Sequence, residues 1–289
     1  MKRMQRIGRI IGIIIALLII IMGTVGCENN SKDTSGQRLV ASNYVPDDSL
    51  TGIKSSGKLI VGTNGESFPF AMIDTKGELI GYDVDIAKYL AEGLGVELEL
   101  VDYDWNGLIP ILIADKVDIV IADMTITAQR ASNVSFSNSY FETGQSLLIS
   151  RKTPGINTWQ DLDKSGMIIA VQMSSSGEYA AQRLFKNVTI KSYLSVNEGG
   201  LALNSGKVDA VLMDQPWVAV WAKKNPETSY AVLDIVTKEK LGIAVKQGKP
   251  ELLQYINTSI EALRDTSEYE DIFNKWFVDM KWLNEVEIK

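Results

Sequence analysis

The chain has 289 residues, of which 45% are hydrophobic and 22% charged, and its formal net charge is −7. This composition excludes a disordered chain, which would hold fewer apolar residues, and the negative charge argues against nucleic-acid binding, which needs clustered Lys and Arg. The sequence contains no histidine, which disfavours His-dependent catalytic triads and the commoner zinc and iron sites. We therefore expect no catalytic residues, no metal and no cofactor.

The first 27 residues predict export and attachment to a lipid. A basic end over residues 2–9 precedes an apolar run from Ile10 to Met22, and small residues lead to Cys27, the only cysteine. Thirteen apolar residues fall short of the roughly 20 that a helix needs to cross a bilayer, so we interpret residues 1–26 as a signal peptide. The arrangement resembles the lipobox of bacterial lipoproteins, although Thr24 stands where leucine is commoner. The alternative is a plain signal peptide or uncleaved anchor with an incidental cysteine.

The lipobox resemblance implies that Cys27 is lipidated, with palmitate among its acyl chains, and becomes the mature N-terminus. Loss of residues 1–26 removes four of the 29 Lys and Arg and no acid, so the formal net charge falls from −7 to −11. Residues 27–57 are predicted to form a lipid-attached tether followed by a short helix near Ser49–Ser55, where Leu50 and Ile53 are spaced to face a core.

From Lys58 onward, strand and helix patterns alternate. In the first half, Asp83 is predicted to cap a helix that runs to Leu94 and is ended by glycine, and Asn106 to cap a second helix. In the second half, Ser195 and Glu198 form the pattern of a capping box. The predicted strands are Lys58–Gly62, Glu97–Tyr103, Asp118–Ala122, Gln145–Ser150, Met167–Val171, Val208–Met213 and Leu241–Val245, and the later helices are Gly177–Phe185, Pro216–Lys224, Glu251–Arg264 and Glu268–Phe277. This alternation predicts parallel α/β sheets in two small lobes.

Polar residues follow four of the predicted strands, where ligands bind in open α/β sheets. Thr127 can cap a short helix that places Arg130 in its first turn. A cation is unfavourable at that end of a helix unless it holds an anion, and the arginine fork matches a carboxylate. The alternative is a surface arginine paired to a neighbouring acid.

The other strand ends suggest partners for a second charge. Ser174, Ser175 and Ser176 lead into a helix whose amides could approach an anion, and Asp214 ends a strand just before another helix. Serine and aspartate are also ordinary helix caps. Arg130 and the serine-rich amides suit an α-carboxylate, whereas Asp214 and Thr125 suit an α-ammonium, the two groups that amino acids share. Trp105 is either an apolar platform for a side chain or part of the core.

At these residues the chain resembles the amino-acid-specific solute-binding proteins of ABC importers, the bacterial extracellular solute-binding protein family 3. The resemblance runs from about Lys58 to Phe277, and it rests on several motifs in register rather than on one. The motifs are Gly81–Ile86 with Leu90, Ala91 and Leu94, then Ala122–Arg130, Val208–Asp214, Gly242–Val245 and Asn274–Phe277.

The resemblance implies an α/β, two-lobed periplasmic-binding-protein-like fold of type II with two hinge strands. We place lobe 1 at 58–141 plus 242–289, lobe 2 at 148–235, and the hinge crossings at 142–147 and 236–241. Arg130 would bind the α-carboxylate with the amides of Thr125 and Ser176. Asp214 would bind the α-ammonium with the Thr125 hydroxyl and the Asp123 carbonyl. The implied ligand-binding set is Asn64, Ser67, Trp105, Asp123, Met124, Thr125, Arg130, Gln172, Ser176 and Asp214, of which Asn64, Ser67, Trp105 and Gln172 would face the side chain.

Two positions depart from the family's common pattern. Relatives often carry an aromatic residue where Ser67 stands, so that wall of the pocket is either absent or supplied by Phe68. Asp123 is acidic where many relatives have a small residue. Because burying an unpaired charge is costly, Asp123 and Asp214 together favour a polar or cationic ligand over an acidic one, provided that Asp123 does not face solvent.

The implied function is the high-affinity capture of a free polar or cationic L-amino acid by a monomer that is lipid-anchored to the cell membrane and faces outside. Hinge closure on the ligand would precede delivery to the permease of an ABC importer. Two alternatives share the fold. One is a prephenate-type dehydratase, which would not need an ammonium site. The other is the ligand-sensing module of a receptor or a murein lyase, which would need a further membrane helix or domain.

Overall fold

The computed structural model describes residues 47–287. The predicted signal peptide, Cys27 and most of the predicted tether therefore lie outside the described residues. Those from Asp47 onward belong to one compact unit. The unit opens with helix α2 (Ser49–Ser56), which buries Ile53 as its spacing predicts and ends at Gly57 in the left-handed conformation.

The first sheet has the strand order β5-β1-β6-β15-β7. Its strands are β1 (Lys58–Thr63), β5 (Glu97–Asp102), β6 (Ile119–Val120), β7 (Val134–Phe136) and β15 (Ala244–Lys246). Strands β5, β1 and β6 are parallel, as predicted, whereas β15 runs antiparallel to both β6 and β7. The predicted parallel pairing is thus confirmed for β5, β1 and β6, and β15, which joins this sheet after the chain has passed through the second sheet, adds an antiparallel strand.

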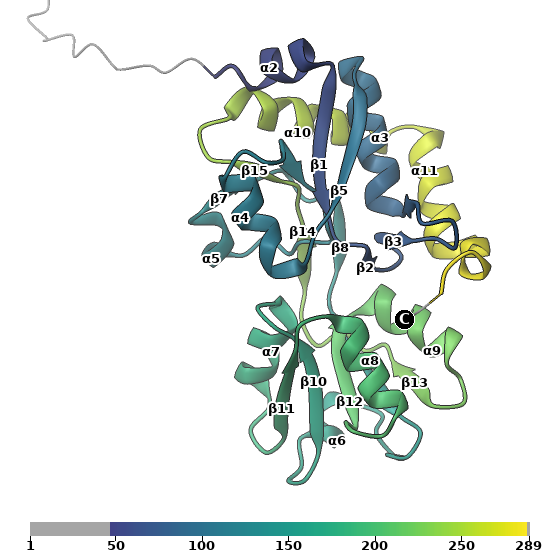
Figure 1. The fold of residues 1–289 in the computed structure, drawn as a ribbon. Coiled ribbons are helices and arrows are strands. Elements are labelled where there is room, and N and C mark those ends of the chain that lie inside the picture. The colour runs from purple at the N-terminus through teal and green to yellow at the C-terminus, as the bar shows by residue number, and fades with distance from the viewer. Residues whose placement is uncertain (1–46, 288–289) are drawn as a thin grey trace, which may run out of the picture. The chain divides into compact units, whose positions relative to one another are not determined.

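Helices cover both faces of the first sheet (Figure 1). Alternate residues of a strand point to opposite faces. Leu59 and Val61 of β1 belong to the core that contains α3 (Tyr82–Leu94), whereas Ile60 packs into a separate core around α4 (Leu108–Ile113). The apolar run of β1 thus reflects a strand that is buried on both sides.

Between β1 and α3 the chain forms a small antiparallel sheet of β2 (Glu66–Ser67), β3 (Ala71–Ile73) and β4 (Leu79–Ile80), which the sequence did not indicate. Helix α3 then begins after Gly81, whose φ is +149° and where a Cβ would lie 2.0 Å from the Phe70 carbonyl oxygen. The prediction that Asp83 caps this helix was wrong, because Asp83 lies in the first turn. Gly95 ends the helix in the left-handed conformation.

Asn106 is not a helix cap either. It lies inside the 3-10 helix η1 (Trp105–Gly107), and α4 begins directly after Gly107.

The second sheet has the strand order β11-β10-β12-β9-β13. Its strands are β9 (Gln145–Ser150), β10 (Ile168–Gln172), β11 (Thr189–Tyr193), β12 (Ala210–Asp214) and β13 (Ser229–Val232). Strand β10 is parallel to β11 and β12, and β9 is antiparallel to β12 and β13. Helix α7 (Ser176–Leu184) packs on one face, with α8 (Val196–Asn204) and α9 (Gln215–Lys224) on the other, and the short helix α6 (Trp159–Leu162) precedes β10. The capping box of Ser195 and Glu198 is confirmed at the start of α8.

Two strands connect the sheets in sequence. Strand β8 (Phe141–Thr143) leads into the second sheet, β14 (Glu239–Leu241) leads out of it, and the two pair antiparallel. The predicted single strand Leu241–Val245 was wrong, because this run is divided between β14 and β15. The Gly242 amide donates to the Met124 carbonyl at the break, which turns the chain from one sheet to the other.

The chain closes with α10 (Pro250–Arg264), α11 (Ser267–Phe273), the π-helix η2 (Asn274–Asp279) and the 3-10 helix η3 (Lys281–Asn284). Asp85 accepts hydrogen bonds from Lys275 Nζ at 2.7 Å and Trp276 Nε1 at 2.8 Å. Two motifs that are almost 200 residues apart therefore meet and hold the C-terminal segment on α3. Within residues 47–287, each helix is too short or too polar to cross a membrane.

Candidate functional site

The loops that follow β6, β10 and β12 place the predicted site residues, and they do so from both sheets. Thr125 follows β6 in the first sheet. Ser176 opens α7 and Asp214 ends β12 in the second. The hydroxyl oxygens of Thr125 and Ser176 lie 3.1 Å apart, so these strand ends meet as the polarity of the sequence predicts.

Arg130 is a buried cation whose partners are neutral. Its residue is 9% exposed and stands in the short helix α5 (Ala128–Ala131), where the Thr127 hydroxyl accepts from the Arg130 amide at 3.2 Å, as predicted. One guanidinium nitrogen donates to the Thr125 carbonyl at 2.8 Å and the other to the Ser174 carbonyl at 3.3 Å. The ion pairs within residues 47–287 do not include Arg130. The carboxyl groups of Asp123, Asp214 and Glu239 act on Arg130 through their charge without a direct ion pair, so its hydrogen bonds leave it suited to a ligand carboxylate.

Two backbone amides are available beside Arg130. In the described part of the chain, neither the Thr125 nor the Ser176 N–H has a hydrogen-bond acceptor. The Ser175 hydroxyl accepts from the Glu178 amide at 3.0 Å and caps α7, which leaves the first helical amide unpaired. A carboxylate between the guanidinium and these amides would satisfy all three groups.

The aromatic neighbour of Arg130 is Trp105. Its ring centroid lies 4.9 Å from the guanidinium carbon, and its indole nitrogen donates to the Ser174 carbonyl at 3.4 Å. A cavity of about 170 Å³ lies at Trp105, Met124 and Arg130. Trp105 is half-buried and packs against the core around α4 while it lines this cavity. Its role as a platform for a ligand side chain stays a prediction.

Asp214 stands at the N-terminal end of α9, but its side chain does not cap that helix. It is 3% exposed and accepts a short hydrogen bond from Gln145 Nε2. Burial raises the pKa of Asp214 well above its usual range, and the carboxylate of Glu239 raises it further. A bound ammonium group would reverse this effect, because an opposite charge favours the ionised carboxylate.

Asp123 faces the protein interior and not the solvent, so the prediction that its charge disfavours an acidic ligand still applies. It is 4% exposed, and its φ of 43° is in the left-handed region. Burial raises the pKa of the Asp123 carboxyl, with further contributions from the charges of Asp214 and Asp83. Several carboxyl groups around one guanidinium favour a ligand with net positive charge and disfavour a second carboxylate.

The remaining members of the predicted set occupy polar buried positions. Asn64 donates to the Tyr103 carbonyl at 3.0 Å and accepts from the Ser67 hydroxyl at 3.4 Å. The side-chain nitrogen of Gln172 is buried without a partner among the described residues. Buried polar groups of this kind are suited to contact a polar side chain of a ligand. Their assignment to the ligand stays a prediction.

Phe68 does not supply the missing aromatic wall. It is buried in a stack with Trp217 at 5.5 Å and Trp221 at 6.1 Å between ring centroids. This Phe68–tryptophan stack joins the loop after β2 to helix α9. Phe68 therefore packs against α9, and Ser67 remains the residue at the position where relatives often carry an aromatic side chain.

Two residues of the site were missed by the sequence reasoning. Gln145 bonds Asp214, and Glu239 accepts from the Thr125 hydroxyl at 2.6 Å. Glu239 lies between Lys238 and Lys240, a pattern that is typical of an exposed charged strand. The sequence carries no clear signal for either residue, because Gln145 and Glu239 meet their partners across 69 and 114 residues.

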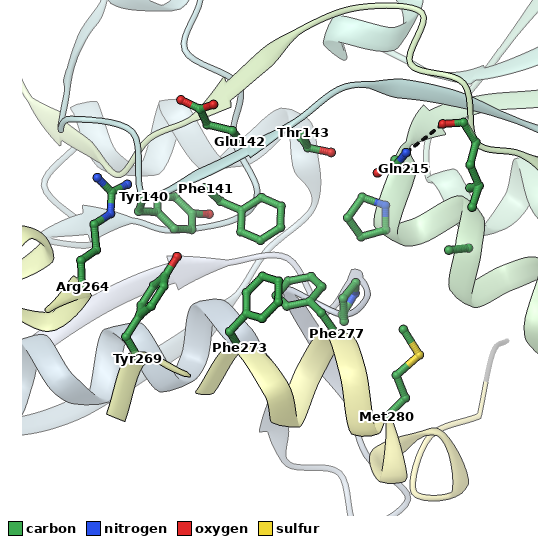
Figure 2. Close-up of a pocket in the computed structure, with 14 residues that line it drawn as sticks. Tyr140, Phe141, Glu142, Thr143, Gln215, Arg264, Tyr269, Phe273, Phe277 and Met280 are labelled. Atoms are coloured by element: carbon green, nitrogen blue, oxygen red, sulfur yellow. Dashed lines mark hydrogen bonds between the residues drawn. The ribbon is translucent and has the colours of Figure 1, made fainter. Parts of the chain in front are cut away.

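A much larger cavity, of about 750 Å³, lies beside β8, and its lining within residues 47–287 includes none of the ten predicted ligand residues. Figure 2 shows the rings of Phe141, Phe273 and Phe277 turned toward one another in it. The larger cavity and the buried charged groups around Arg130 therefore lie in different places. We assign the site to the charged groups around Arg130, because the lining of the larger cavity does not bring a buried cation and buried carboxyl groups together as the Arg130 site does. Across the described range, no cluster of acidic, His or Cys side chains could hold a metal ion.

Replacing Asp83 with asparagine is expected to flatten the dependence of stability on pH. Burial raises the pKa of Asp83 to about 7, although its carboxylate accepts from the Asp123 amide at 2.8 Å. Between about pH 4 and pH 7 the folded state keeps a proton that the unfolded state releases, so stability falls as pH rises through this window. Asparagine can still accept from the Asp123 amide, but it cannot ionise. Melting temperatures from pH 4 to pH 8 should therefore decline less in Asp83→Asn than in the wild type, and parallel curves would contradict this assignment.

Comparisons with known proteins show the family of the chain. Residues 59–279 match the family of bacterial extracellular solute-binding proteins, family 3. The glutamine-binding protein of an ABC transporter in Bacillus subtilis (strain 168) is 32% identical over 250 residues, which cover 85% of this chain and 89% of that protein.

Two solved structures also match this chain. A putative binding component of an ABC transporter from Wolinella succinogenes, complexed with lysine, is 38% identical, with a TM-score of 0.76 over 79% of this chain and 99% of that one. An ancestral amino-acid-binding protein described as a precursor of cyclohexadienyl dehydratase is 36% identical, with a TM-score of 0.74 over 79% of this chain and 99% of that one.

Proposed function

Because the chain belongs to the bacterial extracellular solute-binding proteins, family 3, we propose that it captures a free amino acid outside the cell membrane and hands it to an ABC importer. The observation that carries this proposal is Arg130, a buried guanidinium bonded to carbonyls, in the same site as the buried carboxylate of Asp214. An α-carboxylate and an α-ammonium would complete both groups at once.

The side chain of the ligand is proposed to be polar or cationic. The carboxylates of Asp123, Asp214 and Glu239 interact with one another and with Arg130, so a positive ligand lowers the repulsion between them. The B. subtilis relative is named for glutamine and the W. succinogenes structure contains lysine. Both are consistent with a neutral polar or a basic side chain.

The capture step is proposed to be hinge closure around β8 and β14. Arg130 and Thr125 belong with the first sheet, and Ser174, Ser176 and Asp214 with the second. A ligand bound to both sets of groups stabilises the closed arrangement because the open one lacks half of these contacts. We propose lobe 1 at 58–141 plus 242–289, lobe 2 at 148–235, and the hinge crossings at 142–147 and 236–241.

Attachment to the membrane rests on sequence. The proposal includes lipidation of Cys27 after removal of residues 1–26, a monomeric binding protein and an importer permease as its partner. A two-lobed module attached to the outer face of the membrane can reach a permease in the same membrane.

An enzymatic function has one observation in its favour, the similarity to the ancestral precursor of a dehydratase. That structure is itself described as amino-acid-binding. A dehydratase acting on a keto acid would not need a site for an ammonium group, whereas Asp214 and Thr125 together suit one, so we favour binding over catalysis. A sensory module would share the site but not the importer.

A thermal-shift screen against the twenty amino acids and cystine tests the function. A ligand at 100 times its Kd stabilises the folded state by about 2.7 kcal/mol, which raises the melting temperature of a domain of this size by about 5–10 °C. We expect the largest rise with lysine, arginine, glutamine or another polar amino acid. A flat response to all of them would overturn the function, and a largest rise with glutamate or aspartate would overturn the charge argument.

A further inference from the structure

Glu239 is a buried carboxylate on a strand that joins the two sheets. It is 8% exposed, and each of its oxygens accepts one hydrogen bond. Thr237 Oγ1 donates to Glu239 Oε1 at 2.7 Å, and Thr125 Oγ1 donates to Glu239 Oε2 at 2.6 Å. Glu239 therefore touches a residue of the proposed binding site without belonging to the predicted ligand set.

The direction of the hydrogen bonds around Thr125 follows from counting protons. A threonine hydroxyl has one proton and two acceptor positions, and an ionised carboxylate has none to give. Since the Thr125 proton goes to Glu239, the contact of 3.1 Å between the two hydroxyls must be a donation from Ser176 to Thr125. Gln145 Nε2 in turn donates to the Ser176 oxygen at 3.4 Å.

The bonds thus form a chain with one polarity, from Gln145 through Ser176 and Thr125 to Glu239. One acceptor position of the Thr125 oxygen remains. Without Glu239 the Thr125 proton could point into the site, where it would repel an ammonium group. With Glu239 the hydroxyl faces the site as an acceptor.

Both ends of this chain stand on the connections between the sheets. Glu239 belongs to β14 and Gln145 begins β9 directly after β8. The Gln145 amide donates to Thr237 Oγ1 at 3.1 Å, and the Val236 amide donates to the Gln145 carbonyl at 2.8 Å. The orientation of the Thr125 hydroxyl is therefore tied to the two strands that would bend during closure.

We propose that Glu239 is a positioning residue, which fixes the Thr125 hydroxyl as an acceptor for the α-ammonium of the ligand and so selects amino acids over acids that lack this group. This inference rests on the proposed function, because it assumes an ammonium beside Thr125. Glu239 acts through Thr125 and is not expected to contact the ligand.

A double-mutant cycle tests whether Glu239 acts through Thr125. The variants are Glu239→Leu, Thr125→Val and the two combined, and calorimetry measures their affinity for L-lysine, L-arginine and L-glutamine. Losing a hydrogen bond to a charged group costs about 10- to 100-fold in affinity, which we expect for Glu239→Leu in the protein that retains Thr125. In the Thr125→Val background the same change should cost less than about threefold, because no hydroxyl is left to orient. An equal loss in both backgrounds would overturn the proposal.

Glu239→Gln is the conservative control. Its amide oxygen can still accept from Thr125 while its amide nitrogen donates to Thr237, so most of the affinity lost in Glu239→Leu should return. A glutamine variant as weak as the leucine variant would show that charge, not hydroxyl orientation, is what matters, and would overturn the proposal.

Ligand-free melting curves of the same four proteins separate this inference from the function. If the wild type binds none of the amino acids of the thermal screen, the proposed function fails, but the melting curves still report on the hydrogen bond between Thr125 and Glu239. Glu239→Leu should lower the melting temperature more in the protein that retains Thr125 than in the Thr125→Val background. Equal shifts would overturn the orientation of Thr125 by Glu239 whether or not any probe binds.

Discussion

Replacing Arg130 with alanine is expected to weaken amino-acid binding by about 30-fold or more, because truncating one partner of a buried charge pair costs about 2–5 kcal/mol. The guanidinium supplies the charge and the forked geometry for the α-carboxylate. Its present bonds to two carbonyls and its contact with Trp105 hold it in place from both sheets. Isothermal calorimetry with the best ligand of the thermal screen measures the loss.

The control for Arg130→Ala is Arg151→Ala. Arg151 is exposed, lies over the Tyr230 ring and donates to the Pro226 carbonyl in the second sheet, away from the site. Its removal should change affinity less than about twofold, as for surface positions. Arg130→Lys keeps the charge without the fork and should recover only part of the loss. Near-normal binding by Arg130→Ala would refute the assignment of the carboxylate.

Replacing Asp214 with asparagine is expected to weaken binding by about 30-fold or more, by the same cost of an unpaired charge. The change is isosteric, and Gln145 can still donate to the remaining oxygen. Folding should therefore be kept while the charge that pairs with the α-ammonium is removed. Calorimetry again measures the loss, and circular dichroism checks the fold.

Asp271→Asn provides the matched control for Asp214→Asn, because Asp271 is an exposed acid on α11. It should bind like the wild type. Comparing Asp214→Asn with the wild type also discriminates between an amino-acid-binding protein and a dehydratase. A keto acid that bound as tightly to Asp214→Asn as to the wild type, while amino acids did not bind the wild type, would favour the dehydratase over the binding protein.

The sequence indicated those parts of the site that depend on local chemistry. Thr127 caps α5 and places Arg130 in its first turn, as its spacing predicts, because a cap and its helix lie within four residues. The strand ends that carry Thr125, Ser176 and Asp214 were predicted for the same reason, since polar residues after an apolar run are visible in one dimension.

Contacts between distant segments were not predictable in this way. Asp83 has the residue type of a helix cap, but its partner is the Asp123 amide, 40 residues away. Glu239 lies between two lysines and pairs with Thr125 across 114 residues. A single sequence does not say which strands will be neighbours, so buried polar pairs of this kind are missed.

The split of the predicted strand Leu241–Val245 between β14 and β15 was missed for the same reason, because it depends on contacts with distant segments. Hydrophobicity marks a buried segment, but it does not specify the sheet that buries it. Here the Gly242 amide donates to the Met124 carbonyl between the two strands, so Leu241 ends one strand while Ala244 and Val245 belong to another.

The Phe68–tryptophan stack has an optical consequence. Phe68 is carried by the loop after β2, whereas Trp217 and Trp221 are carried by α9, and all three rings are buried. Hinge opening that separated these segments would admit water to the two indoles and move their fluorescence emission to longer wavelength. The protein therefore carries an intrinsic chromophore pair at which opening and closing can be followed by stopped-flow spectroscopy, without attaching a dye.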